Sequence, residues 1–233
     1  MAINVYWTCT EKEWMRAEAP MPLVSHYYKN RKFDKSYPNF NPHMCPGFNT
    51  FFKNMFVLKS LYSYSFKVEN GNVIAGDYNQ EFFNTHVSVR HPGKKAFSFM
   101  QRFIFFTDEP SLKATLCLPP FLEDNNNIAE RCIVFPGELD IGQWFRNTDM
   151  AFYLKEKYDE FVIEEGEVFN YMKFHTDEDI NFIPFRFNNK LFSFLNDGAN
   201  SKMNKSRPWS MEKYYSLFKG KKLILKEIKE NLL

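Results

Sequence analysis

Leu61-Tyr-Ser-Tyr-Ser-Phe-Lys-Val-Glu-Asn-Gly-Asn-Val-Ile-Ala-Gly76 is the stretch of sequence that decides the fold class. Aromatic and aliphatic side chains alternate with serine and lysine up to residue 68, a period of two that predicts a β-strand. Its buried face is expected to carry Tyr62, Tyr64, Phe66 and Val68, and its other face Ser63, Ser65 and Lys67. Asn70-Gly71 follows, and this dipeptide is preferred in type I′ turns because both central residues need positive φ. The stretch therefore predicts an antiparallel hairpin.

Further short segments of strand type continue from this hairpin to residue 187. They cover residues 85–90, 96–106, 114–118, 132–135, 150–155, 160–163, 168–174 and 181–187. Short strands with turns at intervals of about 8–12 residues are typical of an all-β sandwich or barrel. We therefore predict that residues 51–187 form the body of the protein, as an antiparallel β-sandwich or a barrel like a double-stranded β-helix.

The two ends of the chain differ from this body. Five prolines interrupt residues 1–50, which are expected to form an irregular wrap with one short strand at residues 3–7. Residues 188–205 are polar and indicate a linker, and residues 206–233 regain a helical period as a C-terminal helical appendage. An isolated helix of this length is marginal in water, so we expect it to dock on the body through Leu223, Leu225, Ile228 and Leu232.

Composition and charge exclude several classes of protein. The 18% aromatic content excludes intrinsic disorder, and no apolar run approaches the roughly 20 residues of a membrane span. The N-terminus resembles no signal peptide, and the four cysteines contain no Cys-x-x-Cys pair, so we expect a soluble cytoplasmic protein with reduced thiols. The net charge of +2 and a basic, amphipathic tail fall short of the usual nucleic-acid footprint, so no nucleic acid is expected as a partner.

His175-Thr-Asp177 is the strongest hint of a metal. His-x-Asp opens the two-histidine, one-carboxylate triad of non-haem iron enzymes. Because no histidine follows His175, the remaining ligand has to come from upstream, and His86 completes the candidate set for iron or another divalent metal. The alternative is an exposed acidic turn between two strands, in which case no cofactor is expected.

Two groups of carboxylates are candidates for acid–base chemistry. Glu138 and Asp140 flank a leucine, and Glu164, Glu165 and Glu167 surround a glycine. Either group could act only if the fold brought it into a cleft, and the alternative is a solvated turn. The sequence contains neither a Gly-x-Ser-x-Gly nucleophile elbow nor a phosphate-binding loop.

Pro136-Gly-Glu-Leu-Asp-Ile-Gly-Gln-Trp-Phe-Arg146 is the segment with the clearest binding character. It brings Gln143, Trp144 and Arg146 together, and tryptophan and arginine are enriched at interaction hot spots. The alternative is a tryptophan buried in the sandwich beside an arginine whose aliphatic part lies along apolar surface.

The same part of the chain carries a family resemblance. Pro136-Gly137, Trp144-Phe145, an aromatic strand at 150–154 and then Glu165-Gly-Glu-Val-Phe169 occur in an order that resembles an uncharacterised β-rich family of bacteria and marine tailed phages. Cys45-Pro46 followed by Asn54-Met-Phe-Val57 is similar to the upstream part of those proteins. The family has no assigned activity, so the resemblance implies an all-β fold and a phage source and assigns no site.

Two functions follow from these observations. The first is a β-sandwich protein that binds a protein partner, a second copy of itself or a small ligand, in the host cytoplasm if a phage encodes it. The second is a non-haem metal-dependent, oxygenase-like enzyme that uses His86, His175 and Asp177. Neither involves a membrane.

Overall fold

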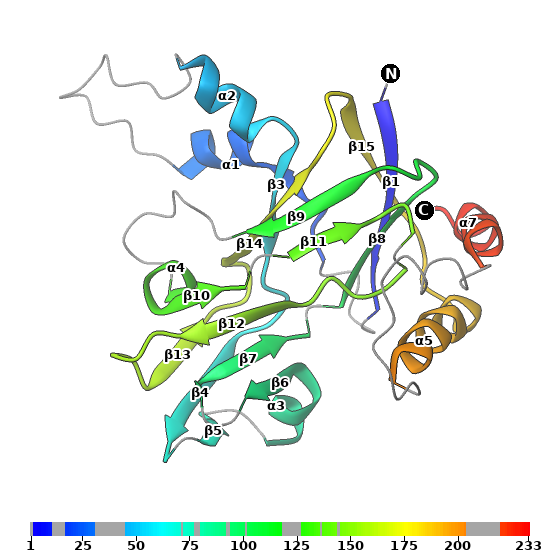
Figure 1. Ribbon diagram of the computed structural model, residues 1–233. Helices are drawn as coiled ribbons and strands as arrows, with labels where there is room; N and C mark the ends of the chain where they lie inside the picture. Colours follow the sequence, from blue (N-terminus) through cyan, green and yellow to red (C-terminus); the bar gives the residue numbers. More distant parts are fainter. Residues whose placement is uncertain are drawn as a thin grey trace.

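The structure is a computed structural model of the 233-residue chain. It describes residues 2–10, 17–30, 45–70, 72–76, 80–91, 94–100, 102–117, 127–135, 137–143, 145–203 and 220–233. Strands predominate in these residues, and they belong to several sheets that do not close into a barrel within the described part of the chain (Figure 1).

The sheets are named here by one strand each. The β1 sheet has the order β15 (Asp179–Pro184), β1 (Ala2–Cys9), β8 (Phe103–Thr107), and the β7 sheet has the order β10 (Cys132–Val134), β12 (Met150–Leu154), β7 (Ala96–Phe99), β6 (Val87–His91). The β9 sheet has the order β11 (Gly137–Asp140), β9 (Lys113–Cys117), β14 (Val168–Phe174), β3 (Met55–Lys59), β2 (Met21–Pro22), and the β4 sheet has the order β13 (Glu160–Ile163), β4 (Tyr64–Glu69), β5 (Asn72–Ala75). These pairs are antiparallel except β1 with β15, which is parallel.

The predicted hairpin is confirmed. Strands β4 and β5 pair so that Glu69 lies opposite Asn72, which leaves a two-residue connection, and Asn70 has a φ of 51° as the turn requires. Tyr64, Phe66 and Val68 are buried, as the alternating pattern predicts, whereas Tyr62 is only half-buried because it lies before the start of β4 at Tyr64. The local sequence was sufficient here because a two-residue turn fixes the register of both strands.

Phenylalanine side chains fill the space between the sheets. Phe66 of β4 lies 4.5 Å from Phe97 of β7, measured between ring centroids, and Phe99 of β7 lies 5.4 Å from Phe169 of β14. These rings and that of Phe105 of β8 belong to one buried cluster, to which the β1, β7, β9 and β4 sheets all contribute. Aromatic contacts across the core thus join the β7 and β1 sheets to the β4 and β9 sheets.

Two predicted strands take a different form. Residues 96–106 form two strands, β7 and β8, because the chain breaks between them at Arg102, whose φ is 58°. The predicted strand at 85–90 begins only at Val87, since helix α3 (Gln80–His86) precedes it.

Among the described residues before position 50, regular elements occur where an irregular wrap with one short strand at residues 3–7 was predicted. Strand β1 is the central strand of its sheet, and helices α1 (Leu23–Asn30) and α2 (Pro46–Phe52) lie over the outer side of β3 and β14 (Figure 1). Pro46 starts α2 instead of breaking it, because a proline in the first helical turn loses no intrahelical hydrogen bond.

The C-terminal part also departs from the prediction. Residues predicted as a linker form helix α5 (Asn189–Met203), and α7 (Lys221–Lys229) packs beside it against the β1 sheet (Figure 1). Ile224 and Ile228 are fully buried there, whereas Leu223 and Leu232, two of the four predicted docking residues, are about half exposed. Of the four predicted docking residues, Ile228 is therefore confirmed and Leu225 packs partly against the same cluster, while Ile224 takes the place of Leu223. The expected helix at 211–219 lies outside the described residues.

Helix α4 (Asn127–Arg131) precedes β10 and completes the described helices. In the part of the chain that the structure describes, no helix is both long and apolar enough to cross a membrane.

Candidate functional site

A group of polar side chains lies on the outer surface of the β9 sheet. On β9, Ala114 and Leu116 point into the core, so Lys113 and Thr115 point outward. Strand β11 places Glu138 opposite Thr115 and Asp140 opposite Lys113, and β14 places Lys173 opposite Thr115. We call the six outward residues of this surface the polar face; they are Lys113, Thr115, Glu138, Asp140, Lys173 and His175.

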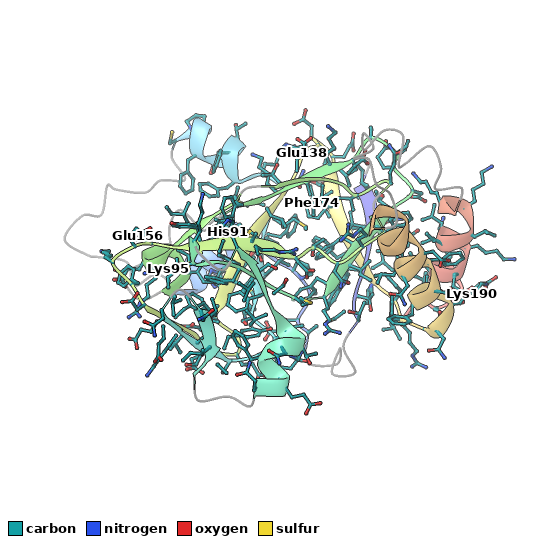
Figure 2. All side chains as sticks on the ribbon, turned by 60° about the horizontal axis from the view of Figure 1, so that its bottom comes forward. His91, Lys95, Glu138, Glu156, Phe174 and Lys190 are labelled. Atoms are coloured by element: carbon teal, nitrogen blue, oxygen red, sulfur yellow. The ribbon has the colours of Figure 1, made fainter. Side chains whose placement is uncertain are left out.

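Short hydrogen bonds connect neighbouring strands across the polar face. His175 follows β14, its backbone N–H donates to Lys113 O at 2.9 Å, and its Nε2 lies 2.6 Å from Thr115 Oγ1. Lys113 Nζ donates to Glu138 Oε1 at 2.7 Å, and both of these side chains remain about half exposed, at 51% and 52%. Figure 2 shows Glu138 at the outer surface of the strands and Phe174 on their inner side.

The pKa values of the two carboxylates of the polar face, Glu138 and Asp140, are shifted in opposite directions. The hydrogen bond and the charge of Lys113 lower the pKa of Glu138, and the charge of His175 acts in the same direction. Burial raises the pKa of Asp140, against the charges of Lys113 and Lys221. Neighbouring titratable groups whose pKa values are moved apart are a feature of functional sites.

Gln143, the first predicted binding residue, adjoins the polar face. Its Nε2 donates to Asp140 Oδ2 at 3.2 Å, and its backbone N–H donates to Asp140 O at 3.1 Å. The turn between them lies close against residues 109–112: a Cβ on Gly142 would come within 2.4 Å of Glu109 O. Only glycine fits this approach, so the turn that positions Gln143 and Asp140 depends on it.

Of the other two predicted binding residues, the structure describes Arg146. Trp144 lies outside the described residues. Phe145 is buried, with its ring 5.4 Å from that of Phe106, and Arg146 continues toward the β7 sheet, where it interacts electrostatically with Asp149. Gln143 and Arg146 therefore interact with different carboxylates, those of Asp140 and Asp149.

The predicted metal ligands do not form a metal site. His86 is buried against the rings of Phe82 and Tyr62, and its Nδ1 lies 2.9 Å from Phe82 O. His175 belongs to the polar face, and Asp177 is exposed in the turn after β14. No three His, Cys, Asp or Glu side chains of the described residues are grouped to hold a metal ion. The structure does not bring the three predicted ligands together, since His86 packs against aromatic rings whereas His175 and Asp177 lie exposed after β14.

The remaining carboxylate group forms a turn. Glu164 Oε2 accepts a hydrogen bond from Ser63 Oγ at 2.6 Å, and Glu167 Oε2 accepts one from the backbone of Glu164 at 2.9 Å. Gly166, with a φ of 83°, supplies the left-handed residue of this turn. The solvated-turn interpretation holds here.

Sequence reasoning missed Lys113 and Thr115. Their only local signal is the alternation of Lys113-Ala-Thr-Leu-Cys117, which identifies a half-buried strand and no function. Their significance comes from the strands beside them, since the pairing of β9 with β11 and β14 brings Glu138 and His175 within reach.

No model of a known protein family matches the chain, and no curated protein is significantly similar to it.

Proposed function

We propose that this chain is a binding protein and that the polar face recognises a protein partner. The observation that carries the proposal is the contact of His175 with Thr115 beside the Glu138–Lys113 ion pair, on one outer sheet surface. These side chains project from paired strands, which hold a recognition surface more precisely than loops do. Three features noted separately in the sequence, His175, the pair Glu138 and Asp140, and Gln143, meet at this surface.

A protein suits the polar face better than a small ligand. Small ligands usually bind in concave sites that bury most of their surface. Lys113 and Glu138 are each about half exposed, so a ligand here would lie on an open surface of alternating charge. Complementary charges on a partner would supply register and specificity, as at ordinary protein interfaces.

A two-layer β-sandwich would leave the outer surface of a sheet as the place for a polar binding site. We infer that β3 with β4, and β14 with β13, continue one layer, and that β7 with β8 belong to the opposite layer of a β-sandwich. The phenylalanine cluster occupies the space between the layers, so a polar ligand has its access from outside. The resemblance to phage proteins adds the prediction that the partner is met in the cytoplasm of an infected cell.

Site-specific photo-crosslinking tests the proposal. A benzophenone amino acid replaces Lys113 on the polar face, and in a matched control it replaces Lys67, an exposed lysine of β4. In lysate of cells that carry the gene, position 113 should give an adduct of defined mass that position 67 does not give, and Glu138→Ala should reduce its yield. Equal adducts from both positions, or about one equivalent of iron, zinc or manganese in protein purified without chelator, would overturn the proposal.

A further inference from the structure

Strand β10 forms one edge of the β7 sheet. Figure 1 shows β12 between β10 and β7, and among the described residues β10 pairs with no strand other than β12. The backbone N–H of Phe135 donates to Ala151 O at 3.0 Å, and the N–H of Lys155 donates to Arg131 O at 2.9 Å. Because the backbone groups of successive residues alternate between the two sides of a strand, those of Val134 point away from β12. Val134 therefore presents one donor and one acceptor at the edge of the sheet.

The outer surface of this edge is apolar. Cys132 and Val134 are buried in the core, whereas Ile133 and, just after the strand, Phe135 point outward and are 52% and 51% exposed. Ile133 lies opposite the half-buried Tyr153 of β12. Two large apolar side chains are thus exposed on the same surface as each other, beside the backbone groups of Val134. An exposed apolar edge of this kind is a site to which another strand can add.

The opposite edge of the same sheet, β6, has features that protect it from such pairing. Its register is interrupted between Val89 and His91, and the exposed Arg90 lies at the interruption. Irregular pairing and charged side chains are common means of protecting a sheet edge. Strand β10 pairs with β12 in a regular register, and its outward residue Ile133 is uncharged. Of the two edges, β10 is therefore the one suited to pairing.

We propose that β10 pairs with β10 of a second copy of this chain, antiparallel and about a two-fold axis at Val134. In this register the Val134 N–H of each chain donates to Val134 O of the other, as in a hydrogen-bonded antiparallel pair. Ile133 then lies opposite Phe135 of the partner subunit, and the two-fold axis repeats this contact. Apolar cross-strand pairs of this type stabilise sheets.

The occupant of the edge is a second copy because the pattern of β10 complements itself. A two-fold interface requires that the same surface match its own copy, and the alternation around Val134 meets this requirement with two identical apolar pairs. Pro136 has no N–H and limits the pairing to this short stretch, so we expect a dimer that dissociates on dilution. The interface uses none of the residues of the polar face.

Sedimentation velocity of the full chain at increasing concentration tests the pairing. The wild-type protein should change from monomer to dimer as the concentration rises. Val134→Pro removes both intersubunit hydrogen bonds but no bond of the ladder with β12, because a proline is tolerated where the N–H points out of the sheet. The dissociation constant of the dimer should therefore rise about tenfold or more.

Val89→Pro is the matched control. The hydrogen bond from Met100 N–H to His86 O at 2.8 Å sets the register of β6, so Val89 likewise directs its N–H away from the sheet. This variant should dimerise like the wild-type protein. Thermal melts of each variant show whether it is folded.

Phe135→Lys tests the side chains independently of the backbone. It places a charge opposite Ile133 of the partner subunit and should weaken the dimer, whereas Phe192→Lys, at an equally exposed phenylalanine of α5, should not. A wild-type protein that stays monomeric at every concentration would overturn the proposal. So would unchanged dimerisation of folded Val134→Pro and Phe135→Lys, or equal weakening by Phe192→Lys.

Disulfide trapping tests the register. Chains with Ile133→Cys and chains with Phe135→Cys, both carrying Cys45→Ser to remove the exposed thiol, are oxidised separately and as a mixture. The mixture should give more disulfide-linked dimer than either chain alone, because the proposed axis places position 133 opposite position 135 at a spacing that a disulfide can bridge. Equal yields in the three samples would contradict the two-fold pairing at Val134.

Discussion

His175 Nε2 lies 2.6 Å from Thr115 Oγ1, although 60 positions separate the two residues in the chain. Strands β9 and β14 pair with Thr115 opposite Lys173, and this register places His175, which follows β14, beside Thr115. The contact is the centre of the polar face, and it can be removed without disturbing the core.

Thr115→Val tests this contact. The substitution keeps the shape of the side chain and removes the hydroxyl. Because His175 is exposed, the free energy of unfolding should fall by less than about 1 kcal/mol in chemical denaturation. Crosslinking from position 113 should nevertheless decrease. Thr50→Val removes an exposed hydroxyl from α2, outside the polar face, and should leave crosslinking unchanged. An equal decrease in crosslinking in Thr115→Val and Thr50→Val would contradict the assignment of the partner-binding surface to the polar face.

Gly142→Ala should destabilise the protein by about 1–3 kcal/mol, the usual cost of forcing an atom into packed surroundings. The added Cβ would lie 2.4 Å from Glu109 O and 2.9 Å from backbone atoms of Pro110. Gly137→Ala is the control, because nothing lies within 4 Å of a Cβ there. Urea denaturation measures both, and equal stability of the two variants would show that residues 109–112 can move away from the turn.

Ile224→Ala and Leu223→Ala distinguish the observed docking face of α7 from the predicted one. Ile224 is fully buried and Leu223 is 56% exposed. Truncating the isoleucine should therefore cost about 2–5 kcal/mol. Truncating the leucine should change stability by about 0.5 kcal/mol or less. A larger loss in Leu223→Ala would mean that Leu223 meets a partner surface in solution.

Glu227 makes the docking of α7 sensitive to acid. Its carboxylate pairs with Lys190 of α5 (labelled in Figure 2) and accepts a hydrogen bond from Asn188 at 2.8 Å. The contact with Lys190, followed by the hydrogen bond from Asn188, lowers the pKa of Glu227 from its usual 4.5. Because the folded pKa is the lower one, the stabilisation is present above about pH 4.5 and is lost as pH falls through the folded value.

Glu227→Gln should accordingly lower stability at pH 7 and reduce its dependence on pH in the acid range. The measurement is the free energy of unfolding at a series of pH values. Glu230→Gln is the control, since Glu230 is exposed and its pair with Lys226, at 3.8 Å, is open to solvent, so its loss should alter neither quantity measurably. An unchanged acid dependence in Glu227→Gln would contradict the role of the Lys190 pair.

The cysteines should differ in reactivity. Burial raises the pKa of Cys132 to about 12, so its thiolate is scarce at neutral pH, and Cys9 is buried as well. Cys45 is exposed. Iodoacetamide at pH 8, followed by mass spectrometry of peptides, should label Cys45 first and Cys132 only after denaturation. Early labelling of Cys132 would show that β10 opens in the native state.

The predictions that succeeded concern features with a local cause. Asn70-Gly71 determines a hairpin because the turn geometry needs those residues, and the alternation after residue 61 determines which face of β4 is buried. The predictions that failed depended on partners elsewhere in the chain. Residues 188–205 are polar enough for a linker, yet α5 forms because Leu191 packs against the β1 sheet.

The sequence by itself determined a strand-rich fold, its main turns and a C-terminal helix, because periodicity and turn chemistry act over a few residues. Only the tertiary structure decided the polar face. Strand pairing joins His175, Thr115 and Glu138. Strand register between distant segments depends on the packing of the whole core, and no local sequence pattern encodes it. Residues that the sequence identified separately could therefore not be assigned to a common site.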